Sequence, residues 1–445
     1  MKKFVQTIKN IWKIEDLRTR IGYTLLFVFL YRVGSFVVLP GIDANKLGAL
    51  ESQTDEGLMA LLNMFSGGAF SNASIFALGI MPYISASIVV QLLAIAVPSF
   101  QKMQREGESG RRKINQITRW LTLLILLFQA PSYLLNLQHT SGAALGAGLD
   151  WTFFMISSTI ILAAGSMFIL WLGERITDKG IGNGVSIIIM IGIIARFPLA
   201  ITQEFTSRVE GAVGGGLIMF VIELLLFVAV ICAGVALLQG TRRVPVQYAK
   251  QSASGATYSG ARQYLPLKVN AANVMPIIFA QAILFIPLAF VSYGGSEAES
   301  SWFVRNMMDH TGWLYNLIFA AMIIAFTYFY TAITINPVQM AEDMKRNNGF
   351  IPGIKPGKPT AEYIDTVMTR ITFPGSLFLA GIAVLPAVAG KLLGVQTEFA
   401  SFFGGTSLLI LVGVVLDTLQ QIESHLLMRH YDGLLSSGRI KGRVG

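Results

Sequence analysis

The chain has 445 residues, of which 53% are hydrophobic and only 13% are charged. Soluble domains carry about 25% charged residues, and the mean hydropathy here is +0.60, so the composition excludes an ordinary soluble protein. A single cysteine and four scattered histidines provide neither a disulfide framework nor a cluster of metal ligands. We therefore expect an integral membrane protein without a metal or a cofactor.

Ten apolar runs follow along the chain, each near the roughly 20 residues that cross a hydrocarbon core. They fall at about 21–39, 75–97, 120–137, 152–173, 183–203, 215–238, 272–292, 313–335, 371–390 and 402–425. The basic region before the first run lacks the apolar core and cleavage site of a signal peptide, so we expect the first span to direct insertion. These runs, and the absence of strand patterns, predict an all-α polytopic protein that forms one membrane domain over residues 1–445.

Lysine and arginine gather in alternate loops, which indicates how the spans are oriented. The N-terminal region and the loops before the third, seventh and ninth runs are basic, whereas the loops between them carry few cations. Since basic loops stay on the cytoplasmic side, both termini are predicted to be cytoplasmic.

Ten spans divide into two halves of five, over residues 1–205 and 206–445. An odd number of spans in each half gives the halves opposite orientations, an arrangement common in transport proteins. This inference rests on the count alone, because no residue-level repeat is visible. The second half carries two long cytoplasmic loops, at 240–268 and 337–370.

Residues 58–74 begin apolar and then become small, polar and glycine-rich. This segment is too broken to span a membrane and too apolar for an ordinary loop. Irregular backbone at membrane depth must lie against protein or a water-filled cavity, so a short, half-buried helix hinged to the next span is one interpretation. An extracytoplasmic loop on the surface is the other. Residues 66–74 offer little apolar area, so we expect folding not to depend on them.

Ionisable side chains inside the runs are few, with Arg32, Glu223 and Asp417 as the main candidates, and none has an obvious partner in the sequence. Polar groups in the spans are mostly neutral, and ordinary hydrogen bonds between helices account for most of them. The scarcity of charge argues against an ion-coupled transporter, and no nucleophile or metal pair suggests an intramembrane enzyme. The residues alone leave a channel and a small-solute transporter both open.

Six stretches are distinctive, at residues 63–88, 106–113, 171–189, 265–270, 352–370 and 403–410. Through them the chain resembles bacterial members of the SecY family from end to end. The resemblance implies ten helices around an hourglass pore, and a channel subunit rather than an enzyme. It further implies translocation of unfolded secretory proteins across the cytoplasmic membrane of a bacterium, and lateral release of membrane proteins into it.

The resemblance also implies roles for individual residues. A plug near 58–74 would include Asn63, Met64, Phe65, Ser66, Gly67, Gly68, Ala69, Phe70 and Ser71. A pore ring that excludes ions by dewetting would consist of Ile80, Ile84, Val185, Ile189, Ile278 and Ile410. A lateral gate, between the second and third spans on one side and the seventh and eighth on the other, would include Ser85, Ser87, Gln91, Gln129 and Gln281. A docking surface on the basic loops would include Arg242, Arg243, Lys250, Lys268, Lys355 and Lys358.

The partners implied by the resemblance are the membrane subunits SecE and SecG, the SecA motor ATPase, the ribosome through its RNA, signal peptides, nascent chains and membrane lipid, with SecDF and YidC as further partners. Energy would come from the motor, the ribosome or the proton-motive force. Three features depart from the family pattern: Lys355 stands where arginine is usual, Val338 where a basic residue is common, and the loop at 251–261 lacks a basic run.

Overall fold

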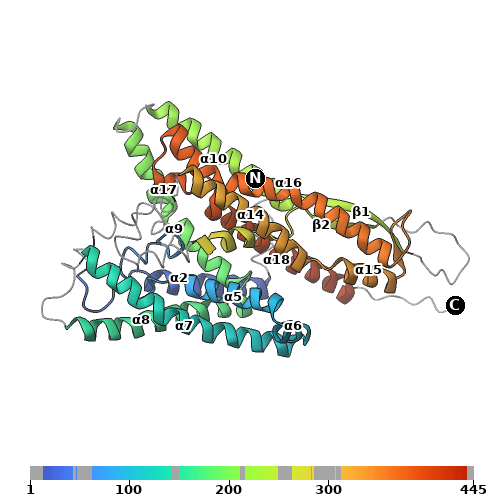
Figure 1. Ribbon diagram of the computed structural model, residues 1–445, viewed down its shortest axis with the longest axis horizontal. Coiled ribbons are helices and arrows are strands. Elements are labelled where there is room, and N and C mark those ends of the chain that lie inside the picture. Colours follow the sequence, from blue (N-terminus) through green and yellow to red (C-terminus); the bar gives the residue numbers. More distant parts are fainter. Residues whose placement is uncertain are drawn as a thin grey trace, which may run out of the picture. The chain divides into compact units, whose positions relative to one another are not determined.

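A computed structural model describes residues 14–43, 47, 63–141, 150–210, 216–248, 263–281, 283–284, 306 and 312–437 of the chain (Figure 1). The described part is mostly helical. Its helices are α2 (Glu15–Gly34), α5 (Met81–Ala96), α6 (Pro98–Arg105), α7 (Glu108–Ser141), α8 (Trp151–Lys179), α9 (Gly184–Val209), α10 (Gly216–Gln239), α14 (Trp313–Thr334), α15 (Pro337–Arg346), α16 (Lys358–Leu393), α17 (Thr397–Ala400) and α18 (Gly405–Ser437). Its strands are β1 (Thr241–Tyr248), β2 (Gln263–Lys268) and β3 (Gly349–Phe350).

Long apolar helices confirm the predicted membrane class. Within the described residues, seven helices are long and apolar enough to cross a membrane, or eight if α5 and α6, which meet at a bend of 103°, count as one span. The first predicted run is α2, which is not among the seven and contains three arginines. The run at 272–292 is described only as far as residue 284. The count of ten spans therefore stays a prediction.

A small antiparallel sheet in the loops at 240–268 and 337–370 was not expected from the sequence. Its strand order is β2-β1-β3, with Thr241 opposite Lys268 and Gln247 opposite Phe350. In β1 exposed and buried residues alternate, and the side chains of Val244 and Val246 enter a buried cluster. This period of two is the strand signal, but it extends over only a few residues and contains a proline. The expectation that the chain has no strands was wrong.

The chain divides into two compact units, one formed by Met1–Ile201 with Val414–Gly445 and the other by Thr202–Gly413. The break near residue 201 lies close to the predicted boundary at 205. However, the C-terminal segment belongs to the first unit, which the division into halves did not anticipate. The inverted relation of the halves stays a prediction.

The first unit is built around α7, which packs against α5, α6 and α8, while α2 packs against α8. Arg119 of α7 makes a two-pronged ion pair with Glu174 of α8, with Nη2 at 2.6 and 2.7 Å from the two carboxylate oxygens. In the same unit, Gln421 of α18 accepts a hydrogen bond from the backbone of Gly182 at 2.8 Å.

The second unit contains a buried cluster of charged side chains, which provides a partner for Glu223 that was not apparent in the sequence. The side chain of Arg208 is 1% exposed, and its guanidinium donates to Glu204 on α9 and to Glu223 on α10. It also donates to the carbonyl of Leu393 at 2.9 Å, and Glu204 accepts from the backbone N–H of Gln396 at 2.9 Å. The cluster therefore ties α9, α10 and the end of α16 together.

Replacing Arg208 by methionine should destabilise the protein by about 3–5 kcal/mol, because two buried carboxylates would lose their shared counter-charge. The apparent midpoint of thermal unfolding of the purified protein in detergent measures this. Arg346→Met, at an exposed position of α15, is the matched control and should leave the midpoint unchanged. Equal midpoints for the two variants would show that the cluster does not hold these helices.

Candidate functional site

The distinctive segment at residues 63–80 runs between four helices of the first unit. Residues 63–65 form a helical turn, and turns continue to residue 80, where α5 begins. The short helix predicted over 58–74 is therefore limited to 63–65 in the described residues, and 58–62 lie outside them. Three glycines and Ala73 have positive φ angles, which explains why no regular helix continues there. We call residues 63–80 the inserted segment.

The inserted segment folds on itself through its own polar side chains. Asn63 Oδ1 accepts the backbone N–H of Ser71 at 3.1 Å, and Ser66 Oγ accepts that of Phe70 at 3.1 Å. The backbone N–H of Gly68 donates to the carbonyl of Asn63 at 2.9 Å. The small polar residues therefore replace the hydrogen bonds that a helix would make.

Side chains of two helices donate to backbone carbonyls of the inserted segment. The hydroxyl of Tyr31 donates to Ser66 at 3.0 Å, and Nη1 of Arg32 donates to Gly67 at 2.7 Å, both from the last turn of α2. From α7, the hydroxyl of Tyr133 donates to the carbonyl of Phe70 at 2.9 Å. Carbonyls that the irregular backbone leaves without helical partners are satisfied in this way.

Glycines let the inserted segment approach the helix backbones closely. A Cβ placed on Gly67 would lie 2.9 Å from the Cα of Gly192 in α9, and a Cβ on Gly192 would lie 2.8 Å from the carbonyl oxygen of Phe65. A Cβ on Gly165 of α8 would lie 2.1 Å from the carbonyl oxygen of Ile75. A larger residue at these positions would have to displace the segment or the helix.

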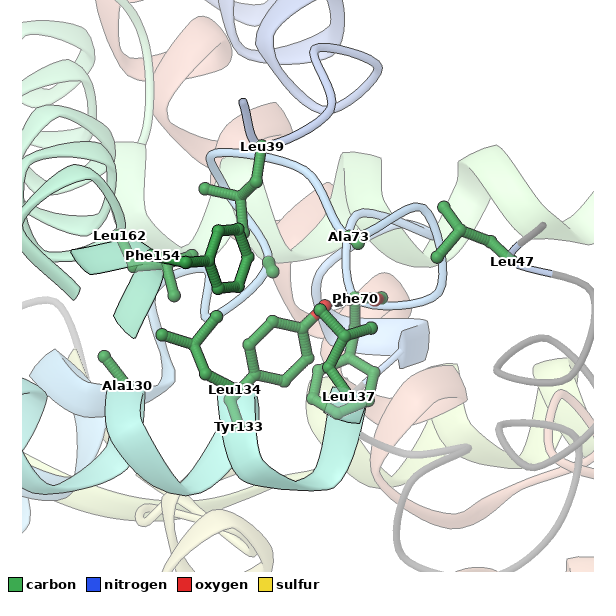
Figure 2. Close-up of a cluster of buried hydrophobic side chains, with 11 residues drawn as sticks. Leu39, Leu47, Phe70, Ala73, Ala130, Tyr133, Leu134, Leu137, Phe154 and Leu162 are labelled. Carbon is green, nitrogen blue, oxygen red and sulfur yellow. Dashed lines mark hydrogen bonds between the residues drawn. The ribbon is translucent and has the colours of Figure 1, made fainter. Parts of the chain in front are cut away.

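The inserted segment also contributes to a hydrophobic core (Figure 2). Phe70, Ala73 and Ala77 are buried there against side chains of α7 and α8, including Leu134 and Leu162. The expectation that residues 66–74 offer little apolar area to bury was therefore wrong, because it weighed composition and overlooked that small residues fit between closely packed helices. That folding can proceed without them stays a prediction.

Residues predicted for the pore ring lie in both units. Ile80 and Ile84 are one turn apart where α5 begins, and Val185 and Ile189 are one turn apart at the start of α9, all in the first unit. The other two members of the predicted ring belong to the second unit, namely Ile278 and Ile410. Since each unit is described by itself, the ring as a whole stays a prediction.

Residues predicted for the lateral gate are polar, and all are half-buried except Gln281, which is buried. Ser85, Ser87 and Gln91 lie on α5, where the amide of Gln91 donates to Ser87 Oγ at 3.3 Å, and Gln129 lies on α7. The helices α5 and α7 pack against each other. Gln281 belongs to the second unit, and the gate itself stays a prediction.

Residues predicted for docking are exposed in the second unit. Arg242 and Arg243 lie on β1, Lys268 lies on β2, and Lys355 and Lys358 lie between β3 and the start of α16. Lys250 lies outside the described residues. The backbone carbonyl of Lys355 accepts the hydroxyl of Thr360 at 2.9 Å, so the turn is fixed while the ammonium group is free to reach a partner.

Sequence reasoning missed the residues that hold the inserted segment. Arg32 was noted only as an ionisable side chain without an obvious partner in the sequence, and Tyr31, Tyr133 and Gly192 were not singled out. One usable signal existed, since an irregular segment at membrane depth needs donors from its neighbours. Which tyrosines supply them depends on packing. Among the described residues, no group of three or more His, Cys, Asp or Glu could hold a metal ion.

The chain matches known proteins over most of its length. The family model SecY matches residues 74–419. The protein translocase subunit SecY of Thermotoga maritima is 41% identical, covering 98% of this chain and 99% of the relative, and that of Corynebacterium glutamicum is 42% identical, covering 98% and 100%.

Solved structures show the same fold. A structure of a protein-conducting channel has a TM-score of 0.61 at 15% identity and covers 95% of each chain. Sec61 in a canine ribosome–channel complex has a TM-score of 0.56 at 14% identity, again over 95% of each chain. Because the family model covers most of the chain and full-length relatives exceed 40% identity, the protein belongs to the SecY family.

Proposed function

We propose that this chain is the pore-forming subunit of a channel through which unfolded secretory proteins cross the cytoplasmic membrane of a bacterium. Membrane proteins would leave the same channel sideways into lipid. Family membership supports this, since its full-length relatives are protein translocase subunits. The structural observation that carries it is the inserted segment, an irregular backbone buried among spans and held by contacts that can break and reform.

Residues 63–71 of the inserted segment act as the plug of this channel. Three side-chain donors, close glycine contacts and a small hydrophobic cluster hold it in place. Each contact is weak enough to be broken singly, because a buried hydrogen bond contributes only about 0.5–1.5 kcal/mol net. A segment held in this manner can seal a pore at rest and move aside for a passing chain.

The pore ring and the lateral gate surround this plug. Branched apolar side chains at the six ring positions would close around a moving chain and exclude ions by dewetting when no chain is present. The gate would open between α5 and α7 on one side and the seventh and eighth spans on the other. The polar side chains along this seam are neutral, and on α5 the amide of Gln91 donates to Ser87 Oγ. Neutral polar groups of this kind can exchange hydrogen bonds between helices at low cost.

The exposed cations of the sheet and of the turn before α16 form a docking surface for partners. Both termini and this surface face the cytoplasm, as the distribution of lysine and arginine suggests. Partners would be the SecA motor and ribosomal RNA, whose phosphates attract such cations, and the SecE and SecG subunits within the membrane. Energy for transport comes from the motor, the ribosome or the proton-motive force.

Gly67→Ala should raise the ion leak of resting channels about tenfold, because its Cβ would press against Gly192 and push the plug out of place. Gly192→Ala should do the same from the helix side. Gly68→Ala is the matched control, since this glycine also has a positive φ but has open space around its Cβ. The measurement is the ion flux from vesicles that contain the complex with each variant. If the ion leak of the Gly67→Ala and Gly192→Ala channels is no greater than that of the Gly68→Ala control, residues 63–71 are not the plug.

Vesicles containing the complex should take up a purified unfolded precursor when motor and ATP are supplied, and vesicles without this chain should not. Lys355→Glu should slow that uptake at least about tenfold, because it reverses a charge at the docking surface, whereas Lys355→Arg keeps the charge and should be tolerated. Uptake by vesicles that lack the chain would contradict the channel function. Normal uptake by the glutamate variant would contradict only the docking role.

A further inference from the structure

Tyr133 makes the link between α7 and the plug. Its hydroxyl donates to the carbonyl of Phe70 at 2.9 Å, and the two rings meet edge to face with centroids 4.7 Å apart. Figure 2 shows Tyr133 beside Phe70, with Leu134 and Leu137 on the same helix. Tyr133 is 5% exposed, so its hydroxyl is shielded from water that could replace the bond.

The other two donors to the plug come from a different helix. Tyr31 and Arg32 lie in the last turn of α2, which packs against α8. Tyr133 lies on α7, which packs against α5, and these two helices form one side of the proposed lateral gate. The plug is thus tied to one helix outside the gate and to one helix within it.

We propose that Tyr133 is a positioning residue that couples opening of the lateral gate to release of the plug. This proposal rests on the proposed function, since it assigns a regulatory link between two of its parts. A hydrogen bond from a hydroxyl is lost beyond about 3.5 Å, so a displacement of α7 by about 1 Å away from the plug breaks the bond to Phe70. The edge-to-face contact of the rings weakens with the same movement.

The hydrogen bond from Tyr133 and the hydrogen bond from Tyr31 have different consequences for gating. Before a signal peptide opens the gate, release of the plug breaks the bond from Tyr133 of α7 as well as the bonds from Tyr31 and Arg32 of α2. After α7 has moved, only the two bonds from α2 remain to be broken among these three. The bond to Tyr133 therefore contributes to the difference between the two states, which is a coupling free energy, whereas the bond to Tyr31 contributes equally to both.

Two substitutions that remove only a hydroxyl test this distinction. Tyr133→Phe and Tyr31→Phe keep their rings and most of their packing, so both should assemble at normal levels. The measurement is ion leak from vesicles that contain the full complex, with and without a synthetic signal peptide. Loss of one such bond changes an equilibrium by about tenfold.

For Tyr133→Phe we expect resting leak to rise about tenfold while leak with the peptide stays the same, so that the ratio of stimulated to resting leak falls about tenfold. For Tyr31→Phe both leaks should rise together and the ratio should be kept. A merely structural role of Tyr133 would lower assembly or change both leaks alike, and would not reduce the ratio.

An unchanged ratio in Tyr133→Phe, or an equal fall of the ratio in Tyr31→Phe, would overturn the coupling. If Gly67→Ala channels still leak in that case, the plug stands and only its link to α7 is lost. If the signal peptide does not raise the leak of the unaltered channel, both the coupling and the proposed gate are overturned.

Discussion

Buried carbonyl groups of an irregular backbone are the constraint on which the rest of this structure depends. Where such groups are shielded from water, each one left without a hydrogen-bond partner destabilises the fold. In the inserted segment, serine hydroxyls donate to some of these carbonyls, as Ser66 does to Asn63 and Ser74 does to Ala69. Tyrosine hydroxyls from α2 and α7 donate to others. The need for donors explains why two buried tyrosines and a half-buried arginine lie against this segment. It also explains why glycines face the segment, because donors reach the carbonyls only if the backbones approach closely.

A segment held by single hydrogen bonds suits a part that must move. The buried cluster of Arg208, Glu204 and Glu223 is the opposite case, because separating those charges in a low dielectric is costly. The inserted segment is held by separate hydrogen bonds from α2 and α7, so displacing one of these helices leaves the bonds from the other intact. The cluster around Arg208 instead joins α9, α10 and the end of α16 at one point. We interpret this contrast as a division between a moving part in the first unit and a rigid frame in the second.

Helices were the most predictable part of the molecule. The run 152–173 lies within α8 and the run 215–238 nearly coincides with α10, because long apolar stretches have few other solutions in a membrane. The sheet of β1, β2 and β3 was missed because its strands are short and lie in polar loops. The partners of Glu223 were missed because they come from other helices, which no pattern within one segment reveals. For the site, composition marked residues 63–71 correctly as unusual, but it suggested a loosely packed segment where the structure has Phe70 buried in a core.

Hydrogen exchange of the inserted segment tests most directly whether reversible contacts hold it in place. Amides of Gly68, Ser71, Ser74 and Ile75 donate to partners within the chain, and in the resting complex they should exchange slowly. In a complex with a translocating chain arrested in the channel, peptides covering residues 63–80 should exchange much faster, while peptides from the middle of α8 should not change. Exchange at the rate of an unstructured peptide in the resting complex, or equal protection with and without the arrested chain, would contradict the account.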